Sequence, residues 1–467
     1  MKRKISFFMI VILICSIILP AANVDAALKM PAVKKNSPVD KNGRLKIKGN
    51  KIVNEKGKTF VIKGISTHGL SWYPEYVTKS TFKSLQTDFG ANTIRLALYT
   101  ADYNGYCTGD KNNQKLLKKR IDQGVKYATE LGMYVIIDWH ILSDGNPKTY
   151  QKESIKFFKE IAEKYKNYTN VIYEICNEPN GGEGTWKNIK SYSNAVIKQI
   201  RKIDKKAIII VGTPTWSQDV DVANNDKISG SNIAYAFHFY ADTHRADMRK
   251  KLENAIKDGL PVIVSEFGIT SASGDGGVNK SEGNKWIKLL DKYSVGRVCW
   301  NLSNKNESSA LLKASCTKVS GFKRSDLSAQ GKWLVDVYKG KLKETSTTQK
   351  ETTETTDKED TTSVKLKAAG KLKNSWVQDN KNYYQYAITV KNTGQKKSAK
   401  WTMSVTFSKK PQFVQGWNGK YSRKGNTITI KSESYNGALK KNESTEIGFI
   451  VCSAKKNKIK KISITGS

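Results

Sequence analysis

The sequence is poor in several residue types, and each scarcity excludes a class of protein. Only 4 of its 467 residues are histidine and 6 are cysteine. No Cys-x-x-Cys spacing occurs, so neither a zinc site nor a dense disulfide framework is expected. We expect the five cysteines beyond the N-terminal segment to be mostly free and buried, where a thiol packs as a small apolar group. After residue 26, no apolar run is long enough to cross a bilayer. We therefore expect no metal and no cofactor.

Acidic residues are also scarce relative to basic ones. The chain has 80 Lys and Arg against 42 Asp and Glu, a formal net charge of +38. Such an excess can indicate nucleic-acid binding. Here the lysines are scattered through every segment, without an arginine-rich arm or a recognition-helix pattern. We interpret them as a lysine-coated surface and expect no nucleic-acid partner, while attraction to an acidic cell wall or acidic plant polymer stays open.

Changes in composition divide the chain into four segments. Residues 1–26 combine a basic start, an apolar run and an Ala-rich end, which predicts a signal peptide and a secreted, extracellular protein with no membrane contact after cleavage. Residues 27–342 alternate strand and helix patterns. Residues 343–364 are rich in Thr and Glu and predict a flexible linker. Residues 365–467 contain strands and turns only, which predicts a smaller all-β sandwich. We expect a monomer.

The second segment contains eight strand-like runs separated by amphipathic helix patterns. The runs are residues 61–66, 93–98, 134–139, 171–176, 208–212, 233–239, 262–265 and 298–301. Apolar strands that alternate with helices predict a parallel sheet, and eight such units fit an α/β fold of the (β/α)8 TIM barrel type. An open doubly wound sheet is the alternative, but no Gly-rich phosphate loop follows the first strand. We expect a hairpin of residues 45–50 and 58–62 to close the barrel floor.

Two of the predicted strands end in a glutamate. The run 171–176 is followed by Asn177-Glu178-Pro179, and the run 262–265 is followed by Glu266. In a barrel of parallel strands, the carboxyl ends of the strands share one rim, where the catalytic groups lie. One glutamate can then serve as acid and base and the other as nucleophile, the minimum set for glycoside hydrolysis. The sequence therefore predicts a retaining mechanism, with the carboxyls of Glu178 and Glu266 about 5 Å apart.

Further polar and aromatic residues fall at the same strand ends. Three of the four histidines do so, namely His68, His140 and His238. The remaining tips carry Arg95, Trp216, Tyr240 and Trp300. We expect Arg95 and Tyr240 to reach Glu266, because an unpaired carboxylate in an aromatic-walled cleft would be partly protonated. We expect loss of the Arg95 side chain to reduce activity while the fold stays intact.

These motifs resemble glycoside hydrolase family five over residues 45–338, and within it the bacterial endo-β-1,4-glucanases. The motifs that carry the resemblance are Thr93-Ile94-Arg95, Asp138-Trp139-His140, Asn177-Glu178-Pro179, His238-Phe239-Tyr240, Ser265-Glu266-Phe267-Gly268 and Trp300-Asn301-Leu302. The resemblance implies that Glu178 is the acid/base, that Glu266 is the nucleophile held by Arg95 and Tyr240, and that Asn177 holds the sugar 2-hydroxyl. The other implied substrate contacts are His140, His238 and Trp300 at the cleavage point, His68, Trp72, Lys305 and Glu307 on the non-reducing side, and Trp216 on the leaving-group side.

The last hundred residues resemble the family-two carbohydrate-binding modules. The resemblance rests on Asn374-Ser375-Trp376, Gln415-Gly416-Trp417-Asn418-Gly419 and Tyr435-Asn436-Gly437. It implies that Trp376, Trp417 and Tyr435 form a cellulose-binding strip, which we expect in or beside turns. Trp401 lies in mid-strand and is expected in the core. A tyrosine replaces the usual third tryptophan and the bridging cysteine pair is absent, so weaker binding or a soluble glucan target is expected.

The sequence thus predicts a secreted endo-β-1,4-glucanase whose partner is cellulose or another β-1,4-glucan. A β-mannanase or a mixed-linkage glucanase is the alternative within the class, because the catalytic pair would be shared. A non-hydrolytic glycan-binding protein and a surface adhesin are the alternatives from other classes. The presence of both glutamates favours the hydrolase.

Overall fold

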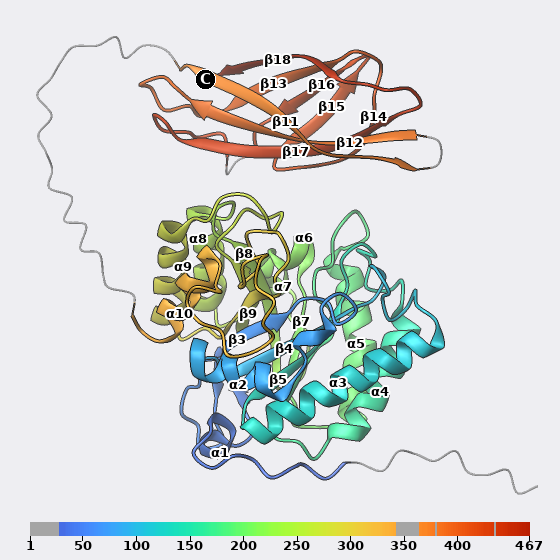
Figure 1. The fold of residues 1–467 in the computed structure, drawn as a ribbon, viewed down its shortest axis with the longest axis vertical. Helices are drawn as coiled ribbons and strands as arrows, with labels where there is room; N and C mark the ends of the chain where they lie inside the picture. The colour runs from blue at the N-terminus through green and yellow to red at the C-terminus, as the bar shows by residue number, and fades with distance from the viewer. Residues whose placement is uncertain (1–27, 342–363, 379–380, 434–435) are drawn as a thin grey trace, which may run out of the picture. The chain divides into compact units, whose positions relative to one another are not determined.

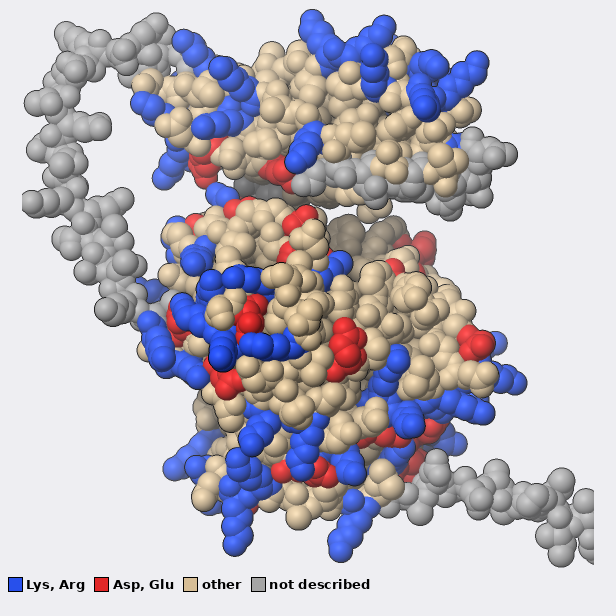
Figure 2. Space-filling view, viewed as in Figure 1, with Lys and Arg blue, Asp and Glu red and all other residues tan. Residues whose placement is uncertain are grey.

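The computed structural model describes residues 28–341, 364–378, 381–433 and 436–467. The chain divides into two compact units, Met1–Leu342 and Lys343–Ser467, which are described separately. The predicted signal peptide and nearly all of the predicted linker lie outside the described residues. Within the described ranges, no helix is both long enough and apolar enough to cross a membrane. Lys and Arg side chains are spread over the visible surface of both units (Figure 2).

The first unit is a closed barrel of eight parallel strands in the order β10-β3-β4-β5-β6-β7-β8-β9, which confirms the predicted fold class (Figure 1). Each strand lies within a few residues of its predicted run, and most are fully buried. The strands are β3 (Lys63–Thr67), β4 (Thr93–Tyr99), β5 (Tyr134–His140), β6 (Val171–Glu174), β7 (Ile209–Val211), β8 (Ile233–Tyr240), β9 (Val262–Gly268) and β10 (Arg297–Leu302).

Helix α1 (Pro38–Asn42) precedes the first strand, and the other helices follow barrel strands and cover the outside of the barrel (Figure 1). These other helices are η1 (Pro74–Tyr76), α2 (Lys79–Ser84), η2 (Leu85–Phe89), α3 (Lys111–Leu131), α4 (Gln151–Tyr165), α5 (Trp186–Ile203), α6 (Pro214–Ser217), α7 (Val220–Asn225), α8 (Ala246–Lys257), α9 (Lys280–Lys292) and α10 (Ala329–Tyr338). The longest is α3. The Asp110 carboxylate accepts a hydrogen bond from the Asn113 backbone amide at its start, and Gly132, with a φ of 69° that suits glycine, follows its end. Its buried face includes Leu117, Ile121 and Val125.

Side chains inside the barrel change from apolar at the floor to charged near the top. The lower interior includes Tyr134, Ile136 and Ile172 and forms one apolar cluster. Because alternate residues of a strand face the same side, the next inward residues after Ile136 and Ile172 are Asp138 and Glu174, which are paired in register. The barrel therefore places a layer of ionisable groups directly beneath its upper rim.

The predicted floor hairpin is wrong in its second strand. The hairpin consists of β1 (Lys46–Lys48) and β2 (Lys51–Val53), joined by a two-residue turn at Gly49-Asn50. Gly49 has a φ of 60°, which lets the chain reverse at once, so β2 follows immediately instead of beginning at residue 58. The segment predicted as the partner touches β2 only through an isolated bridge between Val53 and Thr59.

The second unit consists of two four-stranded antiparallel sheets, as expected for a β-sandwich. One sheet has the order β11-β12-β17-β14 and the other β15-β16-β13-β18. The strands are β11 (Leu366–Gln378), β12 (Lys381–Asn392), β13 (Trp401–Phe407), β14 (Gln412–Trp417), β15 (Lys420–Lys424), β16 (Thr427–Lys431), β17 (Ser444–Ser453) and β18 (Ile459–Gly466). Trp401 is buried in the core between the sheets, as predicted.

The expected turn position of the aromatic strip is wrong for Trp376. Trp376 lies within β11, opposite Tyr383 of β12, and Trp417 is the last residue of β14. Tyr435 lies outside the described residues. The five cysteines of the described ranges are free, and all but Cys107 are buried.

Candidate active site

Glu266 is placed at the barrel rim by an irregularity in β9. Ala236 of β8 pairs with Ile263, but His238 pairs with Glu266, so β9 has one extra residue between the two pairs. Such a bulge allows consecutive side chains to face the same side. Accordingly, Ser265 and Glu266 both point into the barrel, where each makes a side-chain hydrogen bond.

The Glu266 carboxylate is held by two donors. Arg95 Nη1 donates to one oxygen at 3.1 Å, and the Tyr240 hydroxyl donates to the other at 2.8 Å. Burial and the charges of Glu266 and Glu178 raise the pKa of Tyr240 well above its usual value, so the phenol keeps its proton and remains a donor. Both contacts are those predicted from the strand ends, and they fix the direction of the Glu266 side chain.

Arg95 connects more groups than the sequence indicated. It is fully buried, and its guanidinium reaches Glu174 at 2.7 Å and Asp138 at 3.1 Å in addition to Glu266. Burial alone would lower the pKa of Arg95, but the three carboxylates outweigh it, so the guanidinium stays charged. Arg95 in turn lowers the pKa of Glu174 to about 2 against the effect of burial, so Glu174 is ionised. Burial raises the pKa of Asp138, whose carboxyl oxygen lies 2.6 Å from His140 Nδ1.

Glu178 lies four residues beyond β6 and faces His238. The distance from Glu178 Oε1 to His238 Nδ1 is 2.9 Å, and His238 Nε2 contacts Ser265 Oγ at 2.9 Å. Burial by itself would lower the pKa of His238, but Glu174 and Glu178 raise it to about 9. A proton is therefore held between His238 Nδ1 and Glu178 Oε1, beside the rim.

Asn177 is fixed through both ends of its amide. Its oxygen accepts from Arg95 Nη2 at 2.6 Å, and its nitrogen donates to the Ile141 carbonyl at 3.1 Å. The same nitrogen lies 3.3 Å from His140 Nε2. Burial lowers the pKa of His140 to about 3, so this imidazole is neutral. The side chains of Asn177, His140 and Glu266 are thus connected through Arg95.

Aromatic rings line the rim on the side of β3, β4 and β10. His68 lies 5.3 Å from both Trp72 and Trp300, and Trp300 stacks on His140 at 5.1 Å. Lys305 extends this wall, because its Nζ lies 5.8 Å from the centre of the Trp72 ring and 2.6 Å from Glu307. Trp72 remains 38% exposed, so its face is open to a ligand. Indole rings of this kind suit the apolar faces of sugars.

Trp216 lies on a left-handed turn after β7. Thr215, Trp216 and Ser217 have φ values of 56°, 55° and 57°, which non-glycine residues seldom adopt. Two contacts fix the turn to the segment that carries Glu178. The Trp216 amide donates to the Pro179 carbonyl at 3.1 Å, and Ser217 Oγ donates to the Asn177 carbonyl at 2.6 Å. The structure therefore brings all thirteen predicted barrel residues to one end of the barrel.

Several residues without a predicted role complete the site. Asp138, Glu174 and Ser265 contact Arg95, His140 or His238, and Gln330 of α10 donates to the Trp300 carbonyl at 2.7 Å. An acidic residue in an otherwise apolar strand signals a buried ion pair, so Asp138 and Glu174 could have been found. Ser265 could not, because its inward direction depends on the bulge.

One cluster in the described ranges has atoms close enough together to suit a cation. It consists of Glu178, His238 and Glu266, whose ligand atoms lie within 4.8 Å of one another. These atoms already contact Arg95, Tyr240 and each other. A bound cation would displace these hydrogen bonds next to a fixed guanidinium, so the donor set does not favour a metal and we assign none.

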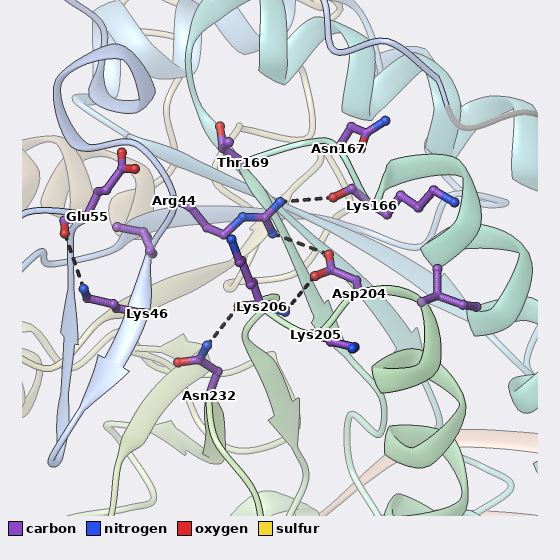
Figure 3. A pocket seen from close by; sticks show the side chains of 12 residues that line it. Arg44, Lys46, Glu55, Lys166, Asn167, Thr169, Asp204, Lys205, Lys206 and Asn232 are labelled. Atoms are coloured by element: carbon purple, nitrogen blue, oxygen red, sulfur yellow. Dashed lines mark hydrogen bonds and ion pairs between the residues drawn. The ribbon is translucent and has the colours of Figure 1, made fainter.

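A hollow lies at the other end of the barrel, among the loops that precede β6, β7 and β8 (Figure 3). Its volume is about 740 Å³. Figure 3 shows one of its charged groups, Arg44, which contacts Asp204 at 3.4 Å and the Lys166 carbonyl at 3.2 Å. Catalytic groups of such barrels lie at the carboxyl ends of the strands, so this hollow is not a candidate active site.

The His238 charge predicts how folding stability depends on pH. Its pKa is about 9 in the folded protein against 6.5 ordinarily. The stabilisation is fully present below about pH 6.5 and is lost as pH rises through about 9, with a magnitude on the order of 1–3 kcal/mol. Chemical denaturation across this range should therefore show a smaller decline in the free energy of unfolding for His238→Gln than for the parent.

His244 provides the matched control for this measurement. It is buried beside Tyr240, but burial lowers its pKa to about 4, so it is neutral throughout the alkaline range. His244→Gln should keep the parent's alkaline decline, whatever it costs in stability. Equal declines in the parent and in His238→Gln would show that His238 is not charged in the folded state.

Comparison with known proteins places both units in described families. The family model described as Cellulase (glycosyl hydrolase family 5) matches residues 53–306, and the model described as Cellulose binding domain matches residues 366–467. Among curated relatives, Endoglucanase A of Butyrivibrio fibrisolvens is 48% identical over 295 residues, which is 63% of this chain and 68% of the relative. An endoglucanase of Clostridium saccharobutylicum is 44% identical over 62% of this chain and 63% of its own length.

Solved structures show the same likeness for the barrel. A cellulase named Cel5C_n has a TM-score of 0.62 and 40% identity, covering 66% of this chain and 95% of its own. The catalytic domain of Thermobifida fusca endoglucanase Cel5A has a TM-score of 0.62 and 35% identity, covering 65% and 99%. A variant of that domain was solved in complex with cellotetraose, with a TM-score of 0.61 and 34% identity over 65% of this chain and 99% of that one.

Proposed function

The chain belongs to glycosyl hydrolase family 5 and carries a cellulose-binding domain after its barrel, and from this membership we propose that it is a secreted endo-β-1,4-glucanase that hydrolyses internal bonds of cellulose with retention of configuration. The observation that carries the proposal is the pair of glutamates at the barrel rim. Their nearest carboxyl oxygens lie within 4.8 Å. Retaining enzymes hold the two carboxyls about 5 Å apart, whereas inverting enzymes leave room for a water molecule between carboxyl and sugar.

In the first step, Glu178 donates a proton to the glycosidic oxygen while the Glu266 carboxylate attacks the anomeric carbon. The bond to the leaving chain breaks, and a covalent glycosyl-Glu266 ester forms. Arg95 and Tyr240 hold the Glu266 carboxylate in position and direct it until attack. The proton held between His238 and Glu178 is positioned for transfer to the leaving oxygen.

In the second step, Glu178 acts as a base. Its carboxylate removes a proton from a water molecule, which attacks the anomeric carbon and releases Glu266. Two inversions at the same carbon restore the starting configuration. Asn177 is fixed by Arg95 and Ile141, so it can contact a sugar hydroxyl without reorganisation. The glycone would lie against the wall formed by Trp72, His68 and Trp300. The leaving chain would lie against Trp216.

Comparison of polymers tests the substrate. The catalytic pair alone does not distinguish glucan from mannan, so carboxymethylcellulose, barley β-glucan and mannan should be compared at equal enzyme concentration. We expect a rapid fall in the viscosity of carboxymethylcellulose before many reducing ends appear, which indicates cleavage of internal bonds. Faster cleavage of mannan than of either glucan would contradict the proposed substrate.

The second unit offers an outward sheet face for the polysaccharide. Ile447 and Phe449 of β17 point into the sandwich core, so Gly448 between them faces outward. The Trp417 indole lies directly over Gly448, where a Cβ would meet the ring at 2.2 Å. Trp417 therefore lies half-buried on the outside of the sheet β11-β12-β17-β14, consistent with a place in a sugar-binding strip.

Removal of residues 343–467 should separate adsorption from chemistry. We expect unchanged turnover on soluble glucans, because the proposed catalytic groups all lie in the barrel unit, and reduced adsorption and activity on insoluble cellulose.

The full-length variant with Trp376→Ala, Trp417→Ala and Tyr435→Ala should lose most adsorption, because each stacked ring contributes on the order of 1 kcal/mol. Trp401 is unsuitable for this test, because its ring is buried in the core between the two sheets. Undiminished adsorption of the triple variant would rule out this strip.

A further inference from the structure

The second unit is far more basic than the barrel, in a way that binding of a neutral glucan does not require. Residues 364–467 contain 22 Lys and Arg against only 4 Asp and Glu. Residues 28–341 contain 52 against 31. The net positive charge per residue is thus more than twice as high in residues 364–467 as in residues 28–341. This density of charge points to a second ligand for the unit, one that carries negative charge.

One face of the second unit combines lysines with a continuous field of hydroxyl groups. On the sheet β15-β16-β13-β18, Met403 and Val405 point into the core, so the residues between them face outward. The same alternation holds on the other strands. We define the hydroxyl–lysine face by its twelve outward residues, Thr402, Ser404, Thr406, Lys420, Ser422, Lys424, Thr427, Thr429, Lys431, Lys461, Ser463 and Thr465.

Strand register places the lysines at two opposite ends of this face. Lys420 and Lys431 are paired neighbours in one row. Two residues further along each strand is a row made only of serine and threonine, namely Ser422, Thr429, Ser404 and Ser463. Beyond it, Lys424 and Lys461 stand at the two ends of the third row, separated by Thr427 and Thr406. Three strand spacings separate them, or about 14 Å.

The charge of the hydroxyl–lysine face is largely uncompensated. Lys420 lies 3.7 Å from Glu433, which follows β16. In the described part of the unit, no ion pair involves Lys424, Lys431 or Lys461, and all three are exposed. None of the twelve outward residues is acidic. Figure 2 shows Lys and Arg side chains projecting over the layer that Figure 1 labels β13, β16 and β18.

We propose that the hydroxyl–lysine face binds an acidic polysaccharide, a chain of sugars that carry carboxylates. Ammonium groups pair with carboxylates, and hydroxyl side chains can both donate to and accept from sugar hydroxyls. The twelve residues include no aromatic ring and no arginine. The face therefore lacks the stacking platform and guanidinium contacts typical of nucleic-acid binding. Because the two sheets are packed core to core, this face is opposite the one that carries Trp417, and an acidic and a neutral chain can bind at the same time.

The test compares two full-length triple variants that lose the same charge. The face variant carries Lys424→Glu, Lys431→Glu and Lys461→Glu. The control variant carries Lys396→Glu, Lys441→Glu and Lys456→Glu, three exposed lysines in loops outside the face. Binding to soluble polygalacturonate is measured by titration at several salt concentrations, with neutral barley β-glucan as the uncharged comparison. A parallel face variant with glutamine at the same three positions guards against disruption by the new acidic groups.

The parent should bind polygalacturonate, and affinity should fall as salt rises. The face variant should lose at least about tenfold in affinity and the control variant less than about threefold, because contacts made by exposed charges are modest and local. The glutamine variant should fall between them. Circular dichroism verifies that the variants fold. Because the measured ligand is polygalacturonate, the outcome does not depend on the proposed cellulose binding. Equal losses in both triple variants, or no binding by the parent, would overturn the proposal. Binding of double-stranded DNA with the same dependence on the face would overturn the assignment to a polysaccharide.

Discussion

Replacement of Glu266 by glycine should abolish turnover of soluble glucan, by at least about ten-thousand-fold, because the covalent route is removed. Arg95 and Tyr240 would lose the carboxylate they hold, but the side chain is at the rim and the barrel should still fold. The rate is measured with a cellooligosaccharide that carries a chromogenic leaving group. Residual activity within a hundredfold of the parent, in a folded variant, would exclude Glu266 as the nucleophile.

Rescue by azide distinguishes Glu266 from Glu178. In Glu266→Gly, azide can occupy the space left by the carboxylate and attack the anomeric carbon directly, which gives a glycosyl azide of inverted configuration. In Glu178→Ala, Glu266 still forms the ester with a good leaving group, and azide then opens it to give retained configuration. The matched pair thus assigns each role by the product. The same azide anomer from both variants would contradict the assignment.

Loss of the Arg95 side chain should impair both chemistry and folding. We expect Arg95→Ala to reduce kcat/KM by at least about a hundredfold, because Glu266 loses the donor that holds and directs its carboxylate. The sequence alone predicted an intact fold, but the structure changes that expectation. Asp138, Glu174 and Glu266 surround Arg95 in the buried layer, and removal of one partner from such a network costs about 3–5 kcal/mol. Thermal unfolding and steady-state rates measure the two effects.

A substitution at Arg297 serves as the control that separates the effect on catalysis from the effect on stability. Like Arg95, Arg297 is a fully buried arginine in a barrel strand, but it is the first residue of β10 and pairs with Asp291 at 2.7 Å. Arg297→Ala should lower stability and leave kcat/KM of the folded fraction close to that of the parent. Arg95→Lys should recover little activity, because one ammonium cannot contact three carboxylates as a guanidinium does. Near-normal turnover in Arg95→Ala would contradict the role of Arg95.

The parts of the fold that follow from a repeated pattern could be predicted from the sequence. Apolar runs that alternate with amphipathic helix patterns predicted the barrel. The helix patterns at residues 186–203 and 329–338 predicted the observed bounds of α5 and α10. In the second unit, alternating patterns predicted β12, β13, β16, β17 and β18, whereas β11, β14 and β15 were missed. The sequence of β15 is Lys-Tyr-Ser-Arg-Lys, with a single core side chain, and β14 contains a register shift between Phe413 and Gln415. Short edge strands carry few inward residues, so their alternation is too weak to detect.

The candidate site shows the same division. Glu178 and Glu266 were identifiable because each follows an apolar run. The position of a carboxylate at a strand tip can be predicted without knowledge of the packing inside the barrel. The contacts of Arg95 with Asp138 and Glu174 depend on which residues share a layer inside the closed barrel. The direction of Ser265 depends on a bulge that no local sequence feature announces. Residues at the strand tips are thus easier to predict than the residues that hold them in place.

The configuration of the first product formed tests the central claim most directly. Proton NMR can follow the anomeric signals of the new reducing end during early hydrolysis of a cellooligosaccharide, before mutarotation mixes them. The proposed double displacement predicts that the β-anomer accumulates first and that the α-anomer appears only by slow mutarotation. Appearance of the α-anomer first would show inversion, and the proposed roles of Glu178 and Glu266 would be wrong.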